Sequence, residues 1–391
     1  MEKVINIKNE VIIIGGDHHN TLSVVRSMGR NKLSYKILIH SNEKEKKMMM
    51  ICHSRFGKNL DVVDETESDI YKWLIDHKSK QKQVIITCSD LAEYAVDNNH
   101  DQLSKYYYMP GFSNHPGMVT YMMNKFNQKK WADKNNLPMA KSWHVDLKKS
   151  MINTDNIEYP CIVKPNISAF GKKSDISICN NEEELKNVIL KFKNENYEDV
   201  IIQKFIKKLY EVCAIGVIVD EKKKYYGRVI KKDRENPPKG GGSLTFAHFI
   251  NDNNINAAVN AVIDVLYKEK YRGLYDIEFL VCEEGIYLNE INFRNSGNNY
   301  ALLKNGIDAP FIYYLDALGK KIDNIKIKTN NMYFMDELNE IMLMKKKGIS
   351  LFTFIRDFIK SSAYAKLDIK DLGIMTFLIK KKFGRKRRIE N

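Results

Sequence analysis

No two cysteines in this chain stand at C-x-x-C spacing, although six cysteines are spread over its 391 residues. Paired cysteines at that spacing are typical of zinc sites and redox motifs, and a regular set of them is typical of small disulfide-rich domains. Several of the six lie inside apolar runs, where a reduced thiol behaves as a small buried hydrophobe. We therefore expect reduced, buried thiols, as in a cytoplasmic protein.

Long apolar segments are also missing, because nowhere do 18 consecutive apolar residues occur. The first residues, MEKVINIKNEVIIIGG, contain neither the long apolar region nor the small-residue cleavage site of a signal peptide. We expect neither a membrane-spanning helix nor secretion through a signal peptide. The pair Gly15-Gly16 has no third glycine at the spacing of a dinucleotide-binding motif, so it predicts a tight strand-to-helix turn.

Positive charge is in excess, with a formal net charge of +14, and 43% of the residues are hydrophobic. This apolar content is sufficient for two or three domains with cores of their own. Much of the excess charge lies in the last segment, in Lys380, Lys381, Lys382, Arg385, Lys386, Arg387 and Arg388. Net charge alone does not distinguish an anionic membrane from an acidic substrate, and we do not expect nucleic acid to be a partner.

Strands and helices alternate along the first part of the chain. Apolar strands at residues 11–14, 35–40 and 84–90 are separated by helical patterns, which predicts a small parallel α/β domain over residues 1–112. The carboxyl ends of such strands form the ligand-facing edge of the sheet. That edge should carry Gly15, Gly16, Asp17, Ser89 and Asp90.

After residue 112 the pattern changes to helices mixed with two antiparallel hairpins. A charged turn joins VCAIGVIVD to KYYGRVIKK, and the turn Glu283-Glu284-Gly285 joins LYDIEFLV to GIYLNEINF. These patterns predict an α+β domain over residues 113–320. We expect residues 321–391 to form a helical, basic extension.

The second hairpin concentrates side chains with hard oxygen atoms. Glu278 lies on its first strand, while Glu290 and Asn292 share one face of its second strand. Folding about the turn would bring Glu278 opposite that pair, and three such ligands suit Mg²⁺. Arg294, on the same face, would bring a cation to an anionic intermediate. The alternative is an acidic strand face that is simply solvated.

The run EINFR, residues 290–294, resembles the E-x-N-x-R signature of the ATP-grasp superfamily, as in biotin carboxylase and the D-alanine:D-alanine ligases. Glu278 stands twelve residues before Glu290, a spacing that the family also shows. The resemblance implies a parallel pre-ATP-grasp domain followed by a two-lobed ATP-grasp domain. It further implies that Glu278, Glu290 and Asn292 hold two Mg²⁺ (or Mn²⁺) ions across the phosphates of ATP. Arg294 would then stabilise the acyl phosphate or its tetrahedral successor.

The resemblance extends upstream to the nucleotide-binding residues. Lys125 in MNKF and Lys164 in CIVKP look like the two lysines with which the family contacts the ATP phosphates. A loop with a single glycine stands in the place of the glycine-rich phosphate loop. The loop residues implied are Ser168, Gly171 and Lys172. The segment VIIQKFI resembles the adenine hinge and is followed by a ribose-binding carboxylate; the residues implied are Gln203, Lys204, Phe205, Ile206 and Glu211.

The stretch GRVIKKDRENPPKGGGS combines basic residues with two prolines and three glycines. The backbone of such a loop can approach a ligand closely, and the neighbouring cations favour an anionic ligand. The stretch is similar to a segment of D-aspartate ligases and related carboxylate-amine ligases, and the chain also resembles the carbamoyl phosphate synthetase-like members. By this resemblance Arg228 and Arg234 would hold the carboxylate substrate and the transferred phosphoryl group.

The function implied is that of an ATP-dependent carboxylate-amine ligase, which activates a carboxylate as an acyl phosphate and passes it to an amine. Aspartate-like amino acids, sugar uronates and precursors of a cell wall or surface polysaccharide all fit a basic pocket. A homodimer is compatible with this reading. Two other readings stay open: a non-catalytic ATP-binding scaffold with a basic tail for membrane or nucleic acid, and a biotin-dependent carboxylase.

The last segment combines an apolar helical pattern at residues 351–359, a second apolar stretch at 375–379 and the basic run 380–388. Apolar residues beside a basic cluster are what a peripheral contact with the inner face of a membrane would use. Such a contact would suit a lipid-linked sugar as acceptor. The alternative is that these helices pack on the ATP-grasp domain and that the basic run is a solvated tail.

Overall fold

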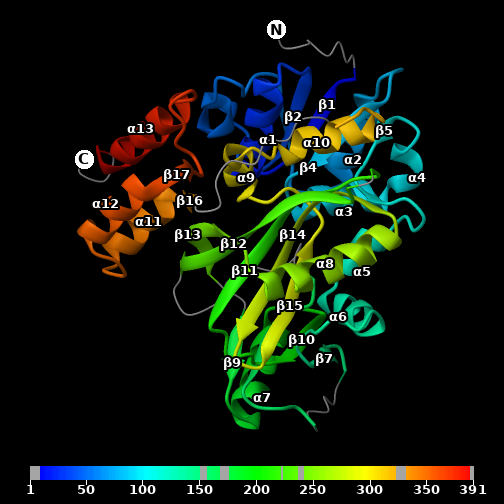
Figure 1. Cartoon of the computed structure of the whole chain (residues 1–391), viewed down its shortest axis with the longest axis vertical. Coiled ribbons are helices and arrows are strands. Elements are labelled where there is room, and N and C mark those ends of the chain that lie inside the picture. Colours follow the sequence, from blue (N-terminus) through cyan, green and yellow to red (C-terminus); the bar gives the residue numbers. More distant parts are fainter. Residues whose placement is uncertain are drawn as a thin grey trace.

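Three sheets organise the chain (Figure 1). The computed structural model describes residues 9–149, 156–167, 176–221, 223–236, 242–322 and 332–387, with side chains up to residue 381. The first sheet lies at the top of Figure 1, the longest sheet runs through the middle, and the smallest sheet lies at the lower end. The predicted order, a parallel domain followed by antiparallel lobes, is confirmed.

The first sheet has five parallel strands in the order β3-β2-β1-β4-β5. Because both faces of a parallel sheet are covered, its central strands are continuous apolar runs. The strands are β1 (Val11–Gly15), β2 (Tyr35–His40), β3 (Leu60–Val63), β4 (Gln83–Thr87) and β5 (Tyr107–Tyr108). The helical elements of this part are α1 (His19–Arg30), η1 (Lys46–Met48), η2 (Ile51–His53), α2 (Glu67–Asp76), α3 (Asp90–Asn98) and α4 (His100–Leu103).

The smallest sheet is antiparallel, in the order β7-β10-β8-β9, and forms a lobe of its own with an apolar core. Its strands are β7 (Ser142–Asp146), β8 (Cys161–Pro165), β9 (Ser177–Cys179) and β10 (Asp199–Lys204). The helices before and within this lobe are α5 (Met118–Met122), α6 (Lys125–Lys134) and α7 (Glu182–Asn194). Asn124 and Asn181 cap α6 and α7 through their side-chain oxygens, which fixes where each helix begins.

The longest sheet has eight strands, in the order β15-β14-β11-β12-β13-β16-β17 with β6 paired to β14. Both predicted hairpins are present, β11 with β12 and β14 with β15. The strands are β6 (Gly111–Phe112), β11 (Tyr210–Ile218), β12 (Tyr225–Asn236), β13 (Ser243–Ile250), β14 (Tyr271–Cys282), β15 (Gly285–Asn292), β16 (Tyr333–Met335) and β17 (Ser361–Tyr364). Its helices are α8 (Asn253–Lys268), α9 (Asn299–Asn305) and α10 (Ala309–Ala317).

The first sheet and the longest sheet share one apolar core. Ile13 of β1, Ile215 of β11 and Tyr313 of α10 belong to the same buried cluster, while Ile12 faces a separate cluster under α2 and α3. Because successive side chains of β1 point to opposite faces of the sheet, this strand contributes to the apolar core on each side. The longest sheet is therefore packed directly against the first domain.

The extension expected to be helical also contributes strands. β16 pairs with β13, and β17 pairs with β16 in parallel, so the extension widens the longest sheet. Its helices are α11 (Glu337–Lys345), α12 (Leu351–Lys360) and α13 (Gly373–Arg387), drawn in orange and red in Figure 1. The buried pair Arg26–Asp371, at 2.9 Å, fastens this extension to α1. Among the described residues, none of the helices has both the length and the apolar character needed to cross a bilayer.

Candidate active site

One face of the longest sheet brings together several of the side chains predicted for the site. Glu290 lies opposite Glu278, which in turn lies opposite Cys213 on β11. The next row of the same face joins Asn292 to Asp276. Residues directly opposite one another on paired strands share a face, so the register alone sets these oxygen atoms side by side.

An acidic cluster occupies the centre of this face. Ligand atoms of Cys213, Asp276 and Glu278 all lie within 4.8 Å of one another. Burial, together with the nearby charges of Asp276 and Glu290, raises the pKa of Glu278 to about 7. Burial also raises the pKa of the Cys213 thiol, so its sulfur stays protonated and is a poor ligand. The remaining donors are hard oxygens, which fit Mg²⁺ or Mn²⁺ and whose mutual repulsion a cation would relieve.

Two lysines from other elements reach the same cluster. The Lys125 Nζ, at the start of α6, lies 3.2 Å from Oε1 of Glu290. Lys164 extends from β8, and its pKa is lowered to about 8 by burial and by the charge of Lys125, against the opposing pull of Glu290 and Glu278. A lysine held in that state gains most from an added anion. Both predicted phosphate contacts therefore stand beside the predicted metal ligands.

Glu211, the predicted ribose ligand, lies in a half-buried network of four charges. Its carboxylate pairs with Lys208 and Lys232, and Glu235 lies 3.2 Å from Lys208 and 3.3 Å from Lys232. Burial by itself would raise the pKa of Glu211, but the two lysines hold it below its usual range. The register places Glu211 directly opposite Lys232, on the face of the longest sheet that carries the acidic cluster; we call it the acidic-cluster face. Lys208, Lys232 and Glu235 were not singled out from the sequence.

The predicted adenine hinge is the segment that leaves β10 for β11, which joins the two lobes. It contains Gln203, Lys204, Phe205 and Ile206. The Lys204 N–H donates to the Lys141 carbonyl at 2.9 Å, and the Phe205 N–H donates to the Pro160 carbonyl at 3.0 Å. These two donors are thus engaged inside the small lobe, and the reading of adenine by this backbone stays a prediction.

Arg294 connects the cluster to the first domain. Its Nε lies 2.6 Å from Oδ1 of Asp90, and its Nη2 donates to Oδ1 of Asn292 at 3.3 Å. Burial would lower the pKa of Arg294, but the carboxylates around it, Asp90 first, raise it above its usual value. Asp90 begins α3 at the edge predicted to face a ligand. The guanidinium therefore remains charged beside the oxygens that are predicted to bind metal.

The turn after Arg294 is seated in the first domain. Asn295 is fully buried, and its N–H donates to the Thr87 carbonyl at 3.0 Å. Its side-chain amide donates to the Asn20 carbonyl at 2.7 Å and to the Ser23 hydroxyl at 2.8 Å. The site is thus assembled across the two domains.

The two predicted substrate arginines have different surroundings. Arg228 lies in the Asp276 row of the face, donates to Oδ1 of Asn305 at 3.1 Å, and has its pKa lowered by burial. Arg234 instead turns to the extension, where Nη2 lies 2.7 Å from Glu340 and Nη1 lies 2.7 Å from Asp357. The structure therefore brings Arg228, and not Arg234, onto the acidic-cluster face.

Three predicted phosphate-loop residues, Ser168, Gly171 and Lys172, lie outside the described residues, as do residues 237–241, which include two of the three glycines of the run at 240–242. Asp276 was missed, although it alternates with Glu278 in LYDIEFLV and its place on the shared face was readable from that alternation. Lys232 was missed because it stands in a lysine-rich stretch, where a single lysine carries no signal.

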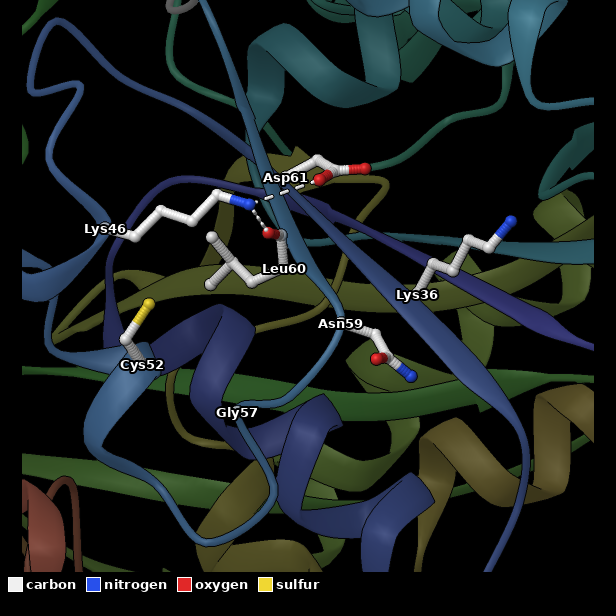
Figure 2. A pocket seen from close by; sticks show the side chains of 7 residues that line it. All are labelled: Lys36, Lys46, Cys52, Gly57, Asn59, Leu60 and Asp61. Carbon is white, nitrogen blue, oxygen red and sulfur yellow. Dashed lines mark hydrogen bonds and ion pairs between the residues drawn. The ribbon is translucent and has the colours of Figure 1, made fainter.

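A depression on the first domain lies apart from this face. Figure 2 shows it beside β3, where the Lys46 ammonium contacts the Leu60 carbonyl and lies 3.3 Å from Asp61. The residues around it are Lys36, Lys46, Cys52, Gly57, Asn59, Leu60 and Asp61. It is an open hollow at an edge strand and contains none of the predicted site residues.

The comparisons with known proteins match the chain at the level of sequence and fold. The family model of the ATP-grasp domain matches residues 130–302. The D-alanine--D-alanine ligase of Campylobacter lari is 26% identical over 196 residues, which are 47% of this chain and 53% of that protein. The chain thus spans about half the length of the curated relatives it matches.

Solved structures show the same fold over most of the chain. The N5-carboxyaminoimidazole synthetase of Staphylococcus aureus, complexed with ADP, superposes with a TM-score of 0.65 at 15% identity and covers 88% of this chain and 87% of that one. The L-amino acid ligase of Bacillus licheniformis gives a TM-score of 0.61 at 14% identity, over 82% of this chain and 78% of that one. At such identities the likeness shows a shared fold.

Proposed function

Because residues 130–302 are an ATP-grasp domain, we propose that this chain is an ATP-dependent carboxylate-amine ligase. The observation that carries the proposal is the convergence of Glu278, Glu290 and Asn292 with Lys125 and Lys164 at one place on the sheet. Carboxylates that hold a divalent cation, next to lysines that meet phosphates, are what transfer of the terminal phosphoryl group of ATP requires.

In the proposed reaction, a carboxylate oxygen attacks the γ-phosphorus of ATP, and ADP leaves. An amine then attacks the carbonyl carbon of the acyl phosphate, its nitrogen loses a proton, inorganic phosphate leaves, and an amide remains. Glu278, Glu290 and Asn292 would hold Mg²⁺ or Mn²⁺, and the cation would neutralise charge on the phosphates. Lys125 and Lys164 would position the phosphates, so catalysis is mainly placement and electrostatics.

Arg294 and Arg228 would act on the carboxylate side of the reaction. Arg294 stays charged between Asp90 and Asn292, within the group of metal-binding oxygens, so it can stabilise charge on the acyl phosphate. Arg228 lies in the Asp276 row and would hold the carboxylate of the substrate. The curated relatives are D-alanine--D-alanine ligases and one solved neighbour is an L-amino acid ligase, so an amino acid is the first substrate class to test.

The test is a screen for ADP release with pooled amino acids, uronic acids and amines, followed by mass analysis of the amide. Glu290→Gln keeps the size of the side chain and removes a metal-binding charge, so we expect loss of turnover with an unchanged circular dichroism spectrum. Glu284→Gln is the matched control, because Glu284 is exposed at the turn of the same hairpin. Near-normal ADP release by Glu290→Gln would refute the assigned metal site.

The screen also separates the two other readings. ATP binding without turnover in any pool would favour a scaffold, while ADP release that depends on bicarbonate and biotin would favour a carboxylase. The cytoplasmic location and the homodimer stay predictions, and the molecular mass of the purified chain in solution tests the latter.

A further inference from the structure

Helix α12 turns a row of large apolar side chains to solvent. Leu351, Phe352, Ile355 and Ile359 are 59%, 76%, 48% and 77% exposed. At about 100° per residue these four positions fall within one arc of about 100° on the helix. We call these four side chains the α12 face. The opposite side of the helix is bound to the protein through Asp357, which is buried.

Every exposed charged side chain between residues 341 and 360 is positive. Between residues 341 and 360 the exposed charged side chains are Lys345, Lys346, Lys347, Arg356 and Lys360. Asp357 carries the negative charge of this stretch, and its buried carboxylate forms ion pairs with Arg234 and Arg356. Glu340 of α11 is likewise buried against Arg234. The surface therefore combines protruding apolar side chains with cations and presents no acidic group over these residues.

We propose that the α12 face docks on an anionic lipid membrane. An interfacial helix inserts apolar side chains among the acyl chains while lysines and arginines reach the headgroups, and this surface supplies both parts. The contact would be weak and reversible, since the helix is short and no described helix spans a bilayer.

A second copy of the chain fits this surface less well. One face of a ten-residue helix is about 15 Å long, whereas a stable interface usually covers about 800 Å² on each partner. Two copies meeting through the α12 face would also bring together the lysines that flank it in the sequence, and like charges repel. A bilayer with acidic headgroups relieves that repulsion.

The ion pairs of Arg234 connect the α12 face to the site-bearing sheet. Arg234 belongs to β12 and holds Glu340 of α11 and Asp357 of α12. These contacts fix the helix to the sheet, so docking would give that sheet a defined orientation to the membrane. The docking itself does not depend on the proposed ligase activity.

The experiment is co-sedimentation of the full chain with vesicles of phosphatidylglycerol and phosphatidylethanolamine, and with vesicles of phosphatidylcholine alone. Phe352→Ser/Ile359→Ser tests the apolar part, and Lys346→Glu/Lys347→Glu tests the charges. Matched controls lie on the small lobe: Leu190→Ser, with 57% exposure in the native chain, and Lys186→Glu/Lys191→Glu, with 61% and 53%. All the altered side chains are exposed, so the variants should melt like the native chain.

We expect binding to the anionic vesicles that weakens with salt and falls at least about tenfold in both α12-region variants, with little change in the small-lobe controls. No binding of the full chain to anionic vesicles would overturn the proposal. Binding that survives Phe352→Ser/Ile359→Ser would overturn it as well. A dimer in solution that this double variant dissociates would assign the α12 face to self-association instead. Turnover is measured separately, so failure of docking and failure of the ligase proposal are distinguishable.

Discussion

ATP binding should carry a proton into the site through Lys164. Burial and the charge of Lys125 lower the pKa of this lysine to about 8, although Glu290 and Glu278 pull in the other direction. Phosphate oxygens next to Nζ favour the charged ammonium and would raise that pKa again. We would therefore measure ATP binding at pH values from 7 to 9, in the absence of divalent metal.

The size of the effect follows from the pKa of about 8 in the free protein. If the complex keeps Lys164 fully charged over this range, ATP binding takes up about 0.1 proton at pH 7, about 0.5 at pH 8 and about 0.9 at pH 9. Because the pKa rises on binding, this contribution to affinity is fully present below pH 8 and is lost as the pH increases. The summed loss between pH 7 and 9 is about tenfold in Kd, or about 1.4 kcal/mol.

The assay is calorimetric titration of ATP in two buffers of different ionisation enthalpy, which gives the number of protons taken up. Leaving out the metal matters, because metal binding would displace protons from Glu278. Lys164→Arg is the control, since a guanidinium stays protonated throughout this range, so this variant should lack the share of the proton uptake that belongs to Lys164. Equal uptake by the native chain and by Lys164→Arg, or no uptake by the native chain at pH 8, would refute the reasoning.

Two further predictions concern stability and metal binding. Arg234→Ala should lower the free energy of unfolding by about 2–4 kcal/mol in urea titrations, because the buried Glu340 carboxylate loses its cation and the buried Asp357 carboxylate keeps only Arg356. Arg272→Ala breaks an exposed pair and should cost less than about 1 kcal/mol, so equal losses would contradict us. Mn²⁺ affinity should increase as the pH rises through about 7, because Glu278 must lose its proton to bind. An affinity that is constant between pH 6 and 8 would count against Glu278 as a ligand.

The hairpin that carries the predicted metal ligands could be predicted because its two strands are close in sequence. Strand alternation gives the shared face of Glu290 and Asn292, and the short turn at Gly285 fixes which residue of β14 meets them. The parallel first domain was readable for the same reason, as its apolar strands and helices follow one another in sequence.

Contacts between distant parts of the chain could not be predicted from the sequence. Asp90 was expected at a ligand-facing edge, but its pairing with Arg294 depends on how two domains pack. Arg234 was read as a substrate ligand because it precedes a glycine run, whereas its partners Glu340 and Asp357 lie more than a hundred residues away. The short strands β16 and β17 carry too few residues for a clear alternation, so their place in the sheet came from the structure alone.

The burial of Asn295 against the first domain limits which parts of the chain can be exchanged between related proteins. The residue reaches Thr87 at the end of β4 and Asn20 and Ser23 of α1, which are two separate elements of the first domain, and Arg294 beside it needs Asp90. A chimera that took the first domain from a relative would leave a fully buried amide unmatched unless the turn at residues 294–299 came with it. The exchangeable module, for natural recombination as for an engineer, is the first domain together with that turn.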